Sequence, residues 1–234
     1  MDNDIELLIP FDTKKSIRVK VLTNWNTVNG SLCNSPGFKI EASFENQIDP
    51  PNRVNLEVGA WFEIYNFKLI PASGLIRTTR SRYQIKLTPF SAISKIEPIS
   101  ESYFICLASF LKIKNGLSHT KFCVDLCGAL VCVGEIEDIE DDEAGGAPIR
   151  QIQFSLINIG FTHLKCVAYG RLAEELNDFW SSTIANTVLC VLRLIEWGPS
   201  GFKFITNTEV SQILFDEDIP EIQEFKKRIP KSCF

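Results

Sequence analysis

The segment Leu164-Lys165-Cys166-Val167-Ala168-Tyr169-Gly170-Arg171 decides the fold, because it reads as a strand that runs directly into a helix. Side chains alternate between the two faces of a strand, so one face is apolar and the other carries Lys165, Val167 and Tyr169. A cation beside an aromatic ring suits a groove for single-stranded nucleic acid, since bases stack on rings and phosphates pair with cations. A half-exposed strand whose tyrosine only covers a neighbour is an equally open interpretation.

Length and composition indicate a well-buried globular protein. The chain has 234 residues, of which 45% are hydrophobic and 11% aromatic, enough for two domains of about 110 residues or one large β domain. No run of about 18 apolar residues predicts a membrane span. The acidic start Met1-Asp2-Asn3-Asp4 lacks the order of a secretory signal, so the 8 cysteines are expected to be thiols in a reducing compartment.

Cysteine spacing gives only a weak metal signal. Cys123, Cys127 and Cys132 form C-x3-C-x4-C, with Cys106 upstream and His119 nearby. Two of these cysteines lie inside an apolar strand-like run, where cysteine usually acts as a small buried hydrophobe. We therefore expect no metal and no cofactor.

Catalysis also finds little support in the sequence. The only histidines, His119 and His163, lie in no motif that pairs them with a nucleophile, and there is no glycine-rich phosphate loop. We expect a protein that is not an enzyme.

The net charge of −5 argues against a general nucleic-acid binder, but the charge is unevenly distributed. Residues 1–95 hold 12 Lys and Arg against 9 Asp and Glu, whereas residues 96–234 hold 12 against 20. Seven carboxylates lie between Glu135 and Glu143, directly before Ala144-Gly145-Gly146-Ala147-Pro148. This composition predicts a solvated, flexible loop.

Strand signals dominate both halves of the chain. In the first half the predicted strands are Ser16–Val21, Phe38–Phe44, Trp61–Leu69, Leu75–Thr79 and Tyr83–Leu87. In the second half they are Tyr103–Lys114, Thr120–Val133, Gln151–Ile157, Leu164–Tyr169, Val188–Ile195 and Phe202–Thr206. Phe90–Ser102 is predicted to be a linker, and helices are predicted at Arg171–Trp180 and Glu221–Arg228.

About five short strands with a short helix after the third, repeated twice, is the order of the OB-fold, a five-stranded Greek-key barrel. We therefore expect an all-β chain of two tandem OB-folds, one at residues 1–95 and a second at residues 96–234 that includes the acidic loop and a short C-terminal helix. OB-folds bind oligonucleotides or oligosaccharides across their second and third strands.

The second half resembles the single-strand-binding OB domains of the replication protein A large subunit, including divergent plant and Helitron-type relatives. Val167-Ala168-Tyr169-Gly170 resembles the end of the family's third strand, and Leu192-Arg193-Leu194-Ile195-Glu196-Trp197-Gly198 resembles the strand that leads to a second stacking aromatic. Phe215-Asp216-Glu217-Asp218-Ile219-Pro220-Glu221 resembles the closing segment. The resemblance implies that Tyr169 and Trp197 are stacking platforms, bordered by Lys165 and Lys203.

The first half resembles the family less closely. Val58–Phe67 and Arg80–Ile85 resemble its fourth and fifth strands. In the third strand Glu41, Ser43 and Glu45 take the ligand face, so the first platform is lost, and Ile76 replaces the second.

Further candidate contacts come from cations and one more aromatic residue. Arg77, Arg80 and Arg82 cluster before Tyr83 and can place guanidinium groups on phosphates or bases, although charges that protect a solvated edge strand are an equal alternative. Arg171 follows the Tyr169 platform. Trp25 follows the first strand and either enters a loop that closes over the ligand or caps the core.

The leading hypothesis is a nuclear protein that binds single-stranded DNA, with RNA as an alternative, in replication, repair, telomere maintenance or transposition. Another OB-fold subunit or a basic protein is a further expected partner, and no membrane is expected. The rival hypothesis is a protein-interaction scaffold that has lost DNA binding, as the pI of 5.2 and the acidic loop suggest. Steep salt dependence distinguishes nucleic-acid binding from a packed protein interface.

Overall fold

The computed structural model describes residues 5, 8, 16–23, 29–35, 38–44, 56–74, 77–140, 148–185, 187–198, 204–215 and 218–229. The chain divides into two compact units, Met1–Cys106 and Leu107–Phe234. Each unit is built around its own β-sheet and its own hydrophobic core. In the part of the chain that is described, no helix is long and apolar enough to cross a membrane.

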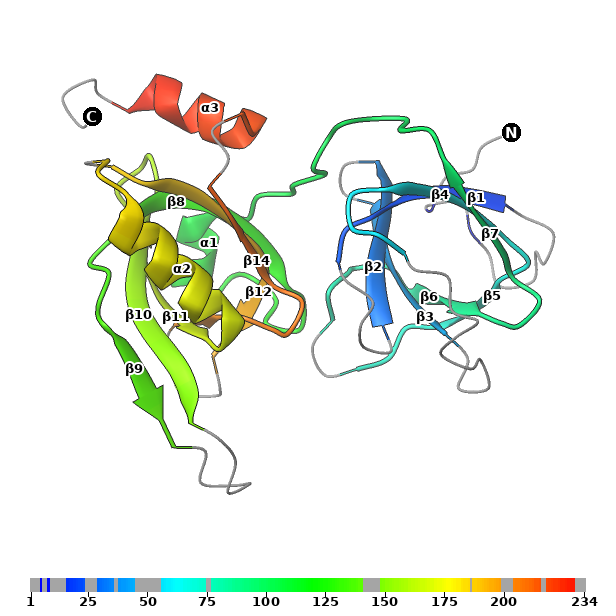
Figure 1. Ribbon diagram of the computed structural model, residues 1–234, viewed down its shortest axis with the longest axis horizontal. Coiled ribbons are helices and arrows are strands. Elements are labelled where there is room, and N and C mark those ends of the chain that lie inside the picture. Colours follow the sequence, from blue (N-terminus) through cyan, green and yellow to red (C-terminus); the bar gives the residue numbers. More distant parts are fainter. Residues whose placement is uncertain are drawn as a thin grey trace. The chain divides into compact units, whose positions relative to one another are not determined.

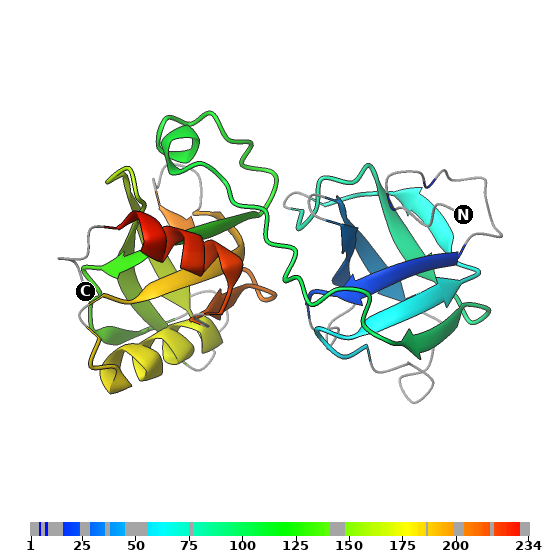
Figure 2. The same ribbon diagram turned by 90° about the horizontal axis from the view of Figure 1, so that it is seen from above.

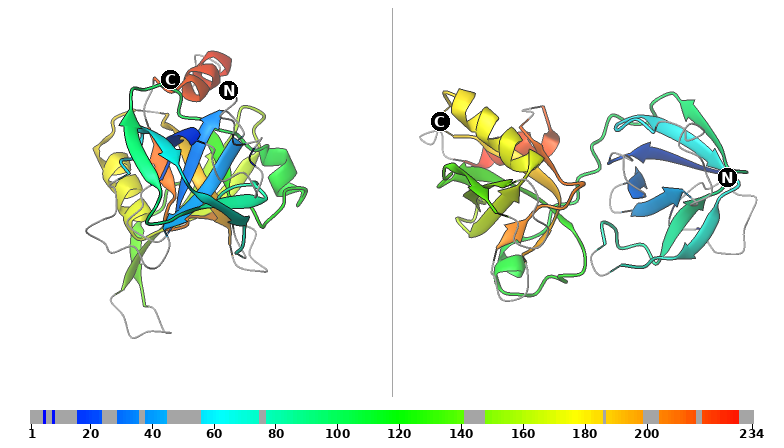
Figure 3. Two further views of the ribbon diagram at one scale, coloured as in Figure 1. Left: turned by 90° about the vertical axis from the view of Figure 1, so that its right-hand side faces the viewer. Right: turned by 60° about the horizontal axis from the view of Figure 1, so that its bottom comes forward.

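The first unit is a seven-stranded sheet that curls into a ring, as the right-hand view of Figure 3 shows. Its strands, in chain order, are β1 (Ser16–Val21), β2 (Asn29–Ser35), β3 (Phe38–Phe44), β4 (Trp61–Tyr65), β5 (Lys68–Pro71), β6 (Tyr83–Leu87) and β7 (Ala92–Ile96). Their spatial order is β5-β6-β3-β2-β1-β4-β7, in which β3 and β6 are parallel and the other pairs antiparallel. Only Asn66 (φ +54°) and Phe67 separate β4 from β5, so these two strands follow each other almost directly along the chain.

Alternation fixes which side of each strand enters the first core. Ile40, Ala42 and Phe44 of β3 are buried in one cluster with apolar residues of β1, β4 and β6, as period-2 patterning requires. The chain beyond β7 also packs on this unit, because Trp61 Nε1 donates to the Ser100 carbonyl at 3.0 Å and the Trp61 ring packs edge-on against Phe104. The first unit therefore extends past its last strand.

The second unit closes its barrel through hydrogen bonds. Its strands are β8 (Val124–Val131), β9 (Ile136–Ile139), β10 (Ile149–Ile157), β11 (His163–Tyr169), β12 (Leu189–Trp197), β13 (Ile205–Thr206) and β14 (Gln212–Leu214). The order β11-β13-β12-β8-β10 returns to β11, because β10 and β11 also pair along seven positions. β9 extends β10 as an antiparallel arm that projects from the barrel in Figure 1.

Three helices complete the second unit: α1 (Phe110–Lys114), α2 (Arg171–Ser182) and α3 (Pro220–Arg228). α2 begins directly after Gly170, whose φ of +57° turns the chain out of β11, and buries Leu172, Ala173 and Leu176. α3 has proline in its first turn and three basic residues in its last turn, both favourable positions, and contacts β8 and β12 (Figure 2).

The predicted fold class is confirmed, since the chain is all-β and its two sheets have the order of tandem OB-folds, with helix α2 after the third main strand of the second barrel. Several predicted elements agree closely with the structure. The predicted ranges Ser16–Val21, Phe38–Phe44 and Tyr83–Leu87 match β1, β3 and β6 at both ends.

Four predictions about local structure were wrong. The predicted strand Tyr103–Lys114 is not a strand: only Leu107 forms an isolated bridge, and Phe110–Lys114 is helix α1, because the Ser109 side chain caps it and Phe110 and Ile113 bury one face. The predicted linker contains β7, which pairs with β4. Arg77–Thr79 forms no strand, and Leu75 and Ile76 lie outside the described residues. Within the predicted acidic loop, Ile136–Ile139 is strand β9, and residues 141–147 lie outside the described part.

Candidate nucleic-acid interface

The strand register defines the surface on which an OB ligand would lie. Leu164, Cys166 and Ala168 of β11 point into the core, so the residues between them point outward. Gln151 of β10 lies opposite Tyr169, and Ser155 lies opposite Lys165. We use the name outer face for the outward residues of β10 and β11, namely Gln151, Gln153, Ser155, Lys165, Val167 and Tyr169, which the buried Thr206 of β13 flanks.

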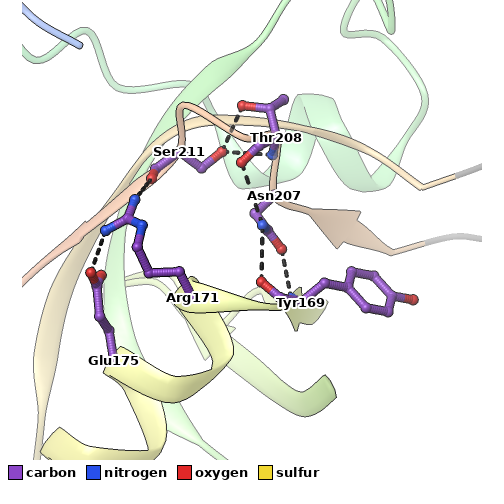
Figure 4. A network of polar contacts seen from close by, with 6 residues as sticks. All are labelled: Tyr169, Arg171, Glu175, Asn207, Thr208 and Ser211. Atoms are coloured by element: carbon purple, nitrogen blue, oxygen red, sulfur yellow. Dashed lines mark hydrogen bonds and ion pairs between the residues drawn. The ribbon is translucent and has the colours of Figure 1, made fainter. Parts of the chain in front are cut away.

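Tyr169 is the aromatic residue of this outer face and is half-buried. Its backbone N–H donates to Asn207 Oδ1 at 2.7 Å, and its carbonyl accepts from Asn207 Nδ2 at 3.3 Å. Figure 4 shows the ring pointing away from these contacts. The exposed side chain of Lys165 lies four residues earlier on the same side of the strand. A flat ring and a cation therefore share one face, as the sequence predicts.

Arg171 is exposed, but its guanidinium is already bound within the barrel. It pairs with Glu175 one turn later on α2 and donates to the Ser211 carbonyl at 3.2 Å (Figure 4). The structure thus gives Arg171 a role in joining α2 to the segment before β14. Its predicted role in nucleic-acid binding stays a prediction.

Trp197 does not share a face with Tyr169. It lies opposite Ile205 across β12 and β13, and Ile205 lies beside Cys166 of β11. Paired residues point to the same side of a sheet, and both partners belong to the core. Trp197 is half-buried against that core, and its Nε1 is buried without a hydrogen-bond partner in the described structure. Its ring is directed inward, away from the outer face.

Phe204 offers a second ring that the sequence reasoning missed. It precedes the inward residue Ile205, so alternation places it on the side opposite the core, where it is half-buried. Its ring packs over Gly198, where an added Cβ would lie 2.6 Å from the ring, and its carbonyl accepts from Gly198 N–H at 3.0 Å. The alternation in Gly201-Phe202-Lys203-Phe204-Ile205 was the available signal.

Strand β9, which carries Glu137 and Asp138, lies next to the outer face because it pairs with β10. Glu137 pairs with Gln151, which pairs with Tyr169, so these three residues form one row. Two interstrand spacings separate the Cα atoms of Glu137 and Tyr169 by about 10 Å. Asp138 points to the opposite side and lies 3.8 Å from the guanidinium of Arg150. One exposed carboxylate therefore stands beside the Tyr169 platform.

The same surface in the first unit carries no ring on β3. Glu41 Oε1 accepts from the N–H and the hydroxyl of Thr78 at 2.8 and 2.9 Å, and the Thr78 hydroxyl lies 2.8 Å from that of Ser31. Two residues after Glu41, on the same side of the strand, stands the buried Ser43. The outward side of β3 is thus polar and internally bonded, and Glu45, the third residue predicted on this face, lies outside the described residues.

The arginines predicted in the first unit differ in exposure. Arg77 is buried and donates to the Ser81 carbonyl, so its guanidinium serves the loop before β6. Arg80 and Arg82 are exposed. Trp25 and Lys203, two further predicted contacts, lie outside the described residues.

Cysteines and carboxylates do not gather into a metal site within the described ranges, where no group of three or more metal-ligating side chains occurs. Burial raises the pKa of Cys166 to about 12. Burial, together with the charge of Glu221, does the same for the pKa of Cys127. Both residues are therefore neutral thiols near pH 7.

Comparisons with known proteins agree with the architecture. Residues 6–116 match the family described as Domain of unknown function DUF223. No curated protein matches the sequence. A replication protein A heterotrimer bound to ssDNA contains a chain that aligns with a TM-score of 0.58 and 16% identity, over 95% of this chain and 53% of that chain. This chain thus spans about half the length of that relative, and at this identity the similarity shows a shared fold.

Two further solved structures align less well. One is a murine DNA-binding protein bound with double-stranded DNA, at 11% identity and a TM-score of 0.40, over 86% of this chain and 97% of that one. The other is fission yeast Pot1 with ssDNA, at 9% identity and a TM-score of 0.30, over 92% of this chain and 88% of that one. Their TM-scores are too low to support an argument.

Proposed function

We propose that this chain binds single-stranded nucleic acid, with single-stranded DNA as the favoured ligand, on the outer face of its second barrel. Tyr169 stacks on a base, Phe204 supplies a second ring, and Lys165 pairs with the backbone phosphates. The observation that carries the proposal is that exposed Lys165 and half-buried Tyr169 share the outward side of β11, the third main strand of an OB barrel, next to its second main strand β10. The proposed activity is binding, without chemistry.

The fold neighbour supports the ligand class. Its chain belongs to a heterotrimer bound to ssDNA and covers nearly this whole chain. By this analogy we extend the proposal to a nuclear role in replication, repair or telomere maintenance, and to assembly with another OB-fold subunit. Arg80 and Arg82 are exposed, and through them the first barrel would contribute to nucleic-acid binding.

A protein-interaction scaffold is the second candidate, and two observations favour it. The outward side of β3 in the first barrel is polar and internally bonded, and Glu137 places a carboxylate in the Tyr169 row of the second. A basic protein surface would meet this charge more favourably than a phosphate backbone would.

Fluorescence anisotropy of the full chain with a labelled 20-nucleotide oligo(dT) separates the two functions. We expect the affinity for this strand to exceed that for a duplex of equal length, and to fall steeply as salt rises, since phosphate neutralisation releases counterions. Titration with an RNA strand of matching length tests whether the protein prefers DNA or RNA. Equal affinity for strand and duplex, or no binding at low salt, would favour the scaffold.

Neutralising Glu137 should tighten the binding of single strands. At about 10 Å in water one charge pair is worth about 0.4 kcal/mol, so Glu137→Gln should increase affinity about twofold at low salt. The gain should shrink at physiological salt, where exposed charges are screened over about 8 Å. Titration of both proteins with oligo(dT) at two salt concentrations measures it.

Asp138→Asn is the matched control for Glu137→Gln. It removes the same charge one residue along β9, from the opposite side of the arm, where Asp138 faces Arg150. Its effect on affinity should be smaller. Equal gains from both variants would mean that only the net charge of the arm matters.

A further inference from the structure

Asn207 forms a two-point contact with the backbone of Tyr169 (Figure 4). Its Oδ1 accepts from the Tyr169 N–H at 2.7 Å, and its Nδ2 donates to the Tyr169 carbonyl at 3.3 Å. One side chain therefore satisfies both polar groups of this residue on the side that faces β13. The contact spans 38 positions of sequence, so it is a tertiary link rather than a local turn.

The strand register explains why a side chain takes this place. β13 runs parallel to β11 for two pairs, Cys166 with Ile205 and Val167 with Thr206. Beyond Thr206 the chain enters a turn in which the Thr208 N–H donates to Ser211 Oγ at 2.8 Å. A carboxamide has a donor and an acceptor, like a peptide group, so Asn207 extends the ladder between the strands by one more step.

The turn that holds Asn207 is itself anchored in the barrel wall. The hydroxyls of Thr208 and Ser211 donate to the Leu194 carbonyl at 3.3 and 2.8 Å. Leu194 has a φ of +53° on the irregular part of β12, and its N–H donates to the buried Asp125 carboxylate at 3.1 Å. The Tyr169 backbone is thus tied through this network to a strand of the core.

We propose that Asn207 is the positioning residue of the Tyr169 platform. This inference rests on the proposed function, and it names the residue that orients the Tyr169 ring. Tyr169 is the last residue of β11, where the chain turns at Gly170 into α2, and strand ends fray unless their polar groups are held. By holding the Tyr169 N–H and carbonyl, Asn207 keeps the ring presented before the ligand arrives and lowers the ordering cost of stacking.

Asn207→Ala removes both contacts and leaves the ring in place. We expect it to weaken oligo(dT) binding by the full chain about threefold to tenfold, the range of one or two net hydrogen bonds. The matched control is Asn158→Ala, because Asn158 Oδ1 also accepts a backbone N–H, that of Thr162 at 2.8 Å, at the other end of β11. This control should leave affinity within twofold of wild type.

A double-mutant cycle with Tyr169→Ala tests whether the effect acts through the ring. In the Tyr169→Ala background, Asn207→Ala should change affinity less than twofold. An equal loss in both backgrounds, or no loss in the wild-type background, would overturn the positioning role while leaving the proposed function intact.

Hydrogen exchange of the Tyr169 amide tests the same inference without any ligand. Exchange should accelerate at least about tenfold in Asn207→Ala, with little change at Val167 and in Asn158→Ala. Unchanged protection at Tyr169 would overturn the inference. A wild-type protein that fails to bind oligo(dT) would overturn the proposed function instead, and the exchange result would then decide the inference alone.

Discussion

Tyr169→Ala is expected to weaken the binding of single-stranded DNA by about 1–3 kcal/mol, which is roughly fivefold to 150-fold in Kd. The ring is half-buried on the outer face, on the same side of β11 as Lys165 and opposite Gln151 of β10. Alanine removes the surface on which a base stacks and leaves the strand intact, because the Asn207 contacts use the Tyr169 backbone. Anisotropy titration with labelled oligo(dT) at low and physiological salt measures the loss.

The control for Tyr169→Ala is an exposed aromatic residue on the same hairpin. Phe161 is 74% exposed in the turn between β10 and β11, at the other end of the strand that carries Tyr169. Phe161→Ala should change affinity by less than twofold. The slope of log Kd against log salt should be nearly equal in wild type and Tyr169→Ala, since stacking releases no counterions. A large change in slope with little loss of affinity would contradict the stacking role.

Much of the fold could be predicted because the strands obey a period of two. Ile40, Ala42 and Phe44, and likewise Leu164, Cys166 and Ala168, alternate with outward residues and lie in their cores. Prediction failed where the pattern was weak. β2 begins with Asn29-Gly30, which reads as a turn, and β9 is an acidic segment whose pairing with β10 has no local signal.

The candidate site was predictable in part, for a related physical reason. Tyr169 and Lys165 share a strand, so alternation alone places them on one face. Whether Trp197 joins them depends on the register between β11, β13 and β12, and on an irregularity in β12 between Leu192 and Ile195. Such long-range pairing has no signature in the local sequence, and this is also why Asn207 was missed, since its contact with Tyr169 spans 38 positions.

Trp197→Ala should lower the stability of the second unit more than it lowers affinity. The ring is packed against the core, where replacing a large aromatic side chain by alanine costs about 3–5 kcal/mol. Because Trp197 is only half-buried, we expect about 2–3 kcal/mol, measured by calorimetry or by urea unfolding followed with circular dichroism. At a temperature where the variant stays folded, its affinity for oligo(dT) should remain within about twofold of wild type.

Two further substitutions separate packing from stacking at Trp197. Trp197→Phe keeps an apolar ring and removes an indole N–H that is buried without a partner among the described residues, so it should recover most of the lost stability. Trp180→Ala, on the exposed side of α2, should cost less than Trp197→Ala, because Trp180 is 36% exposed and therefore less buried than Trp197. Tyr169→Ala should show the opposite pattern, with near-normal stability and weakened binding.

A stable Trp197→Ala protein with an affinity as low as that of Tyr169→Ala would instead make the indole a stacking platform. That result would require β12 to turn at its end so that the ring leaves the core.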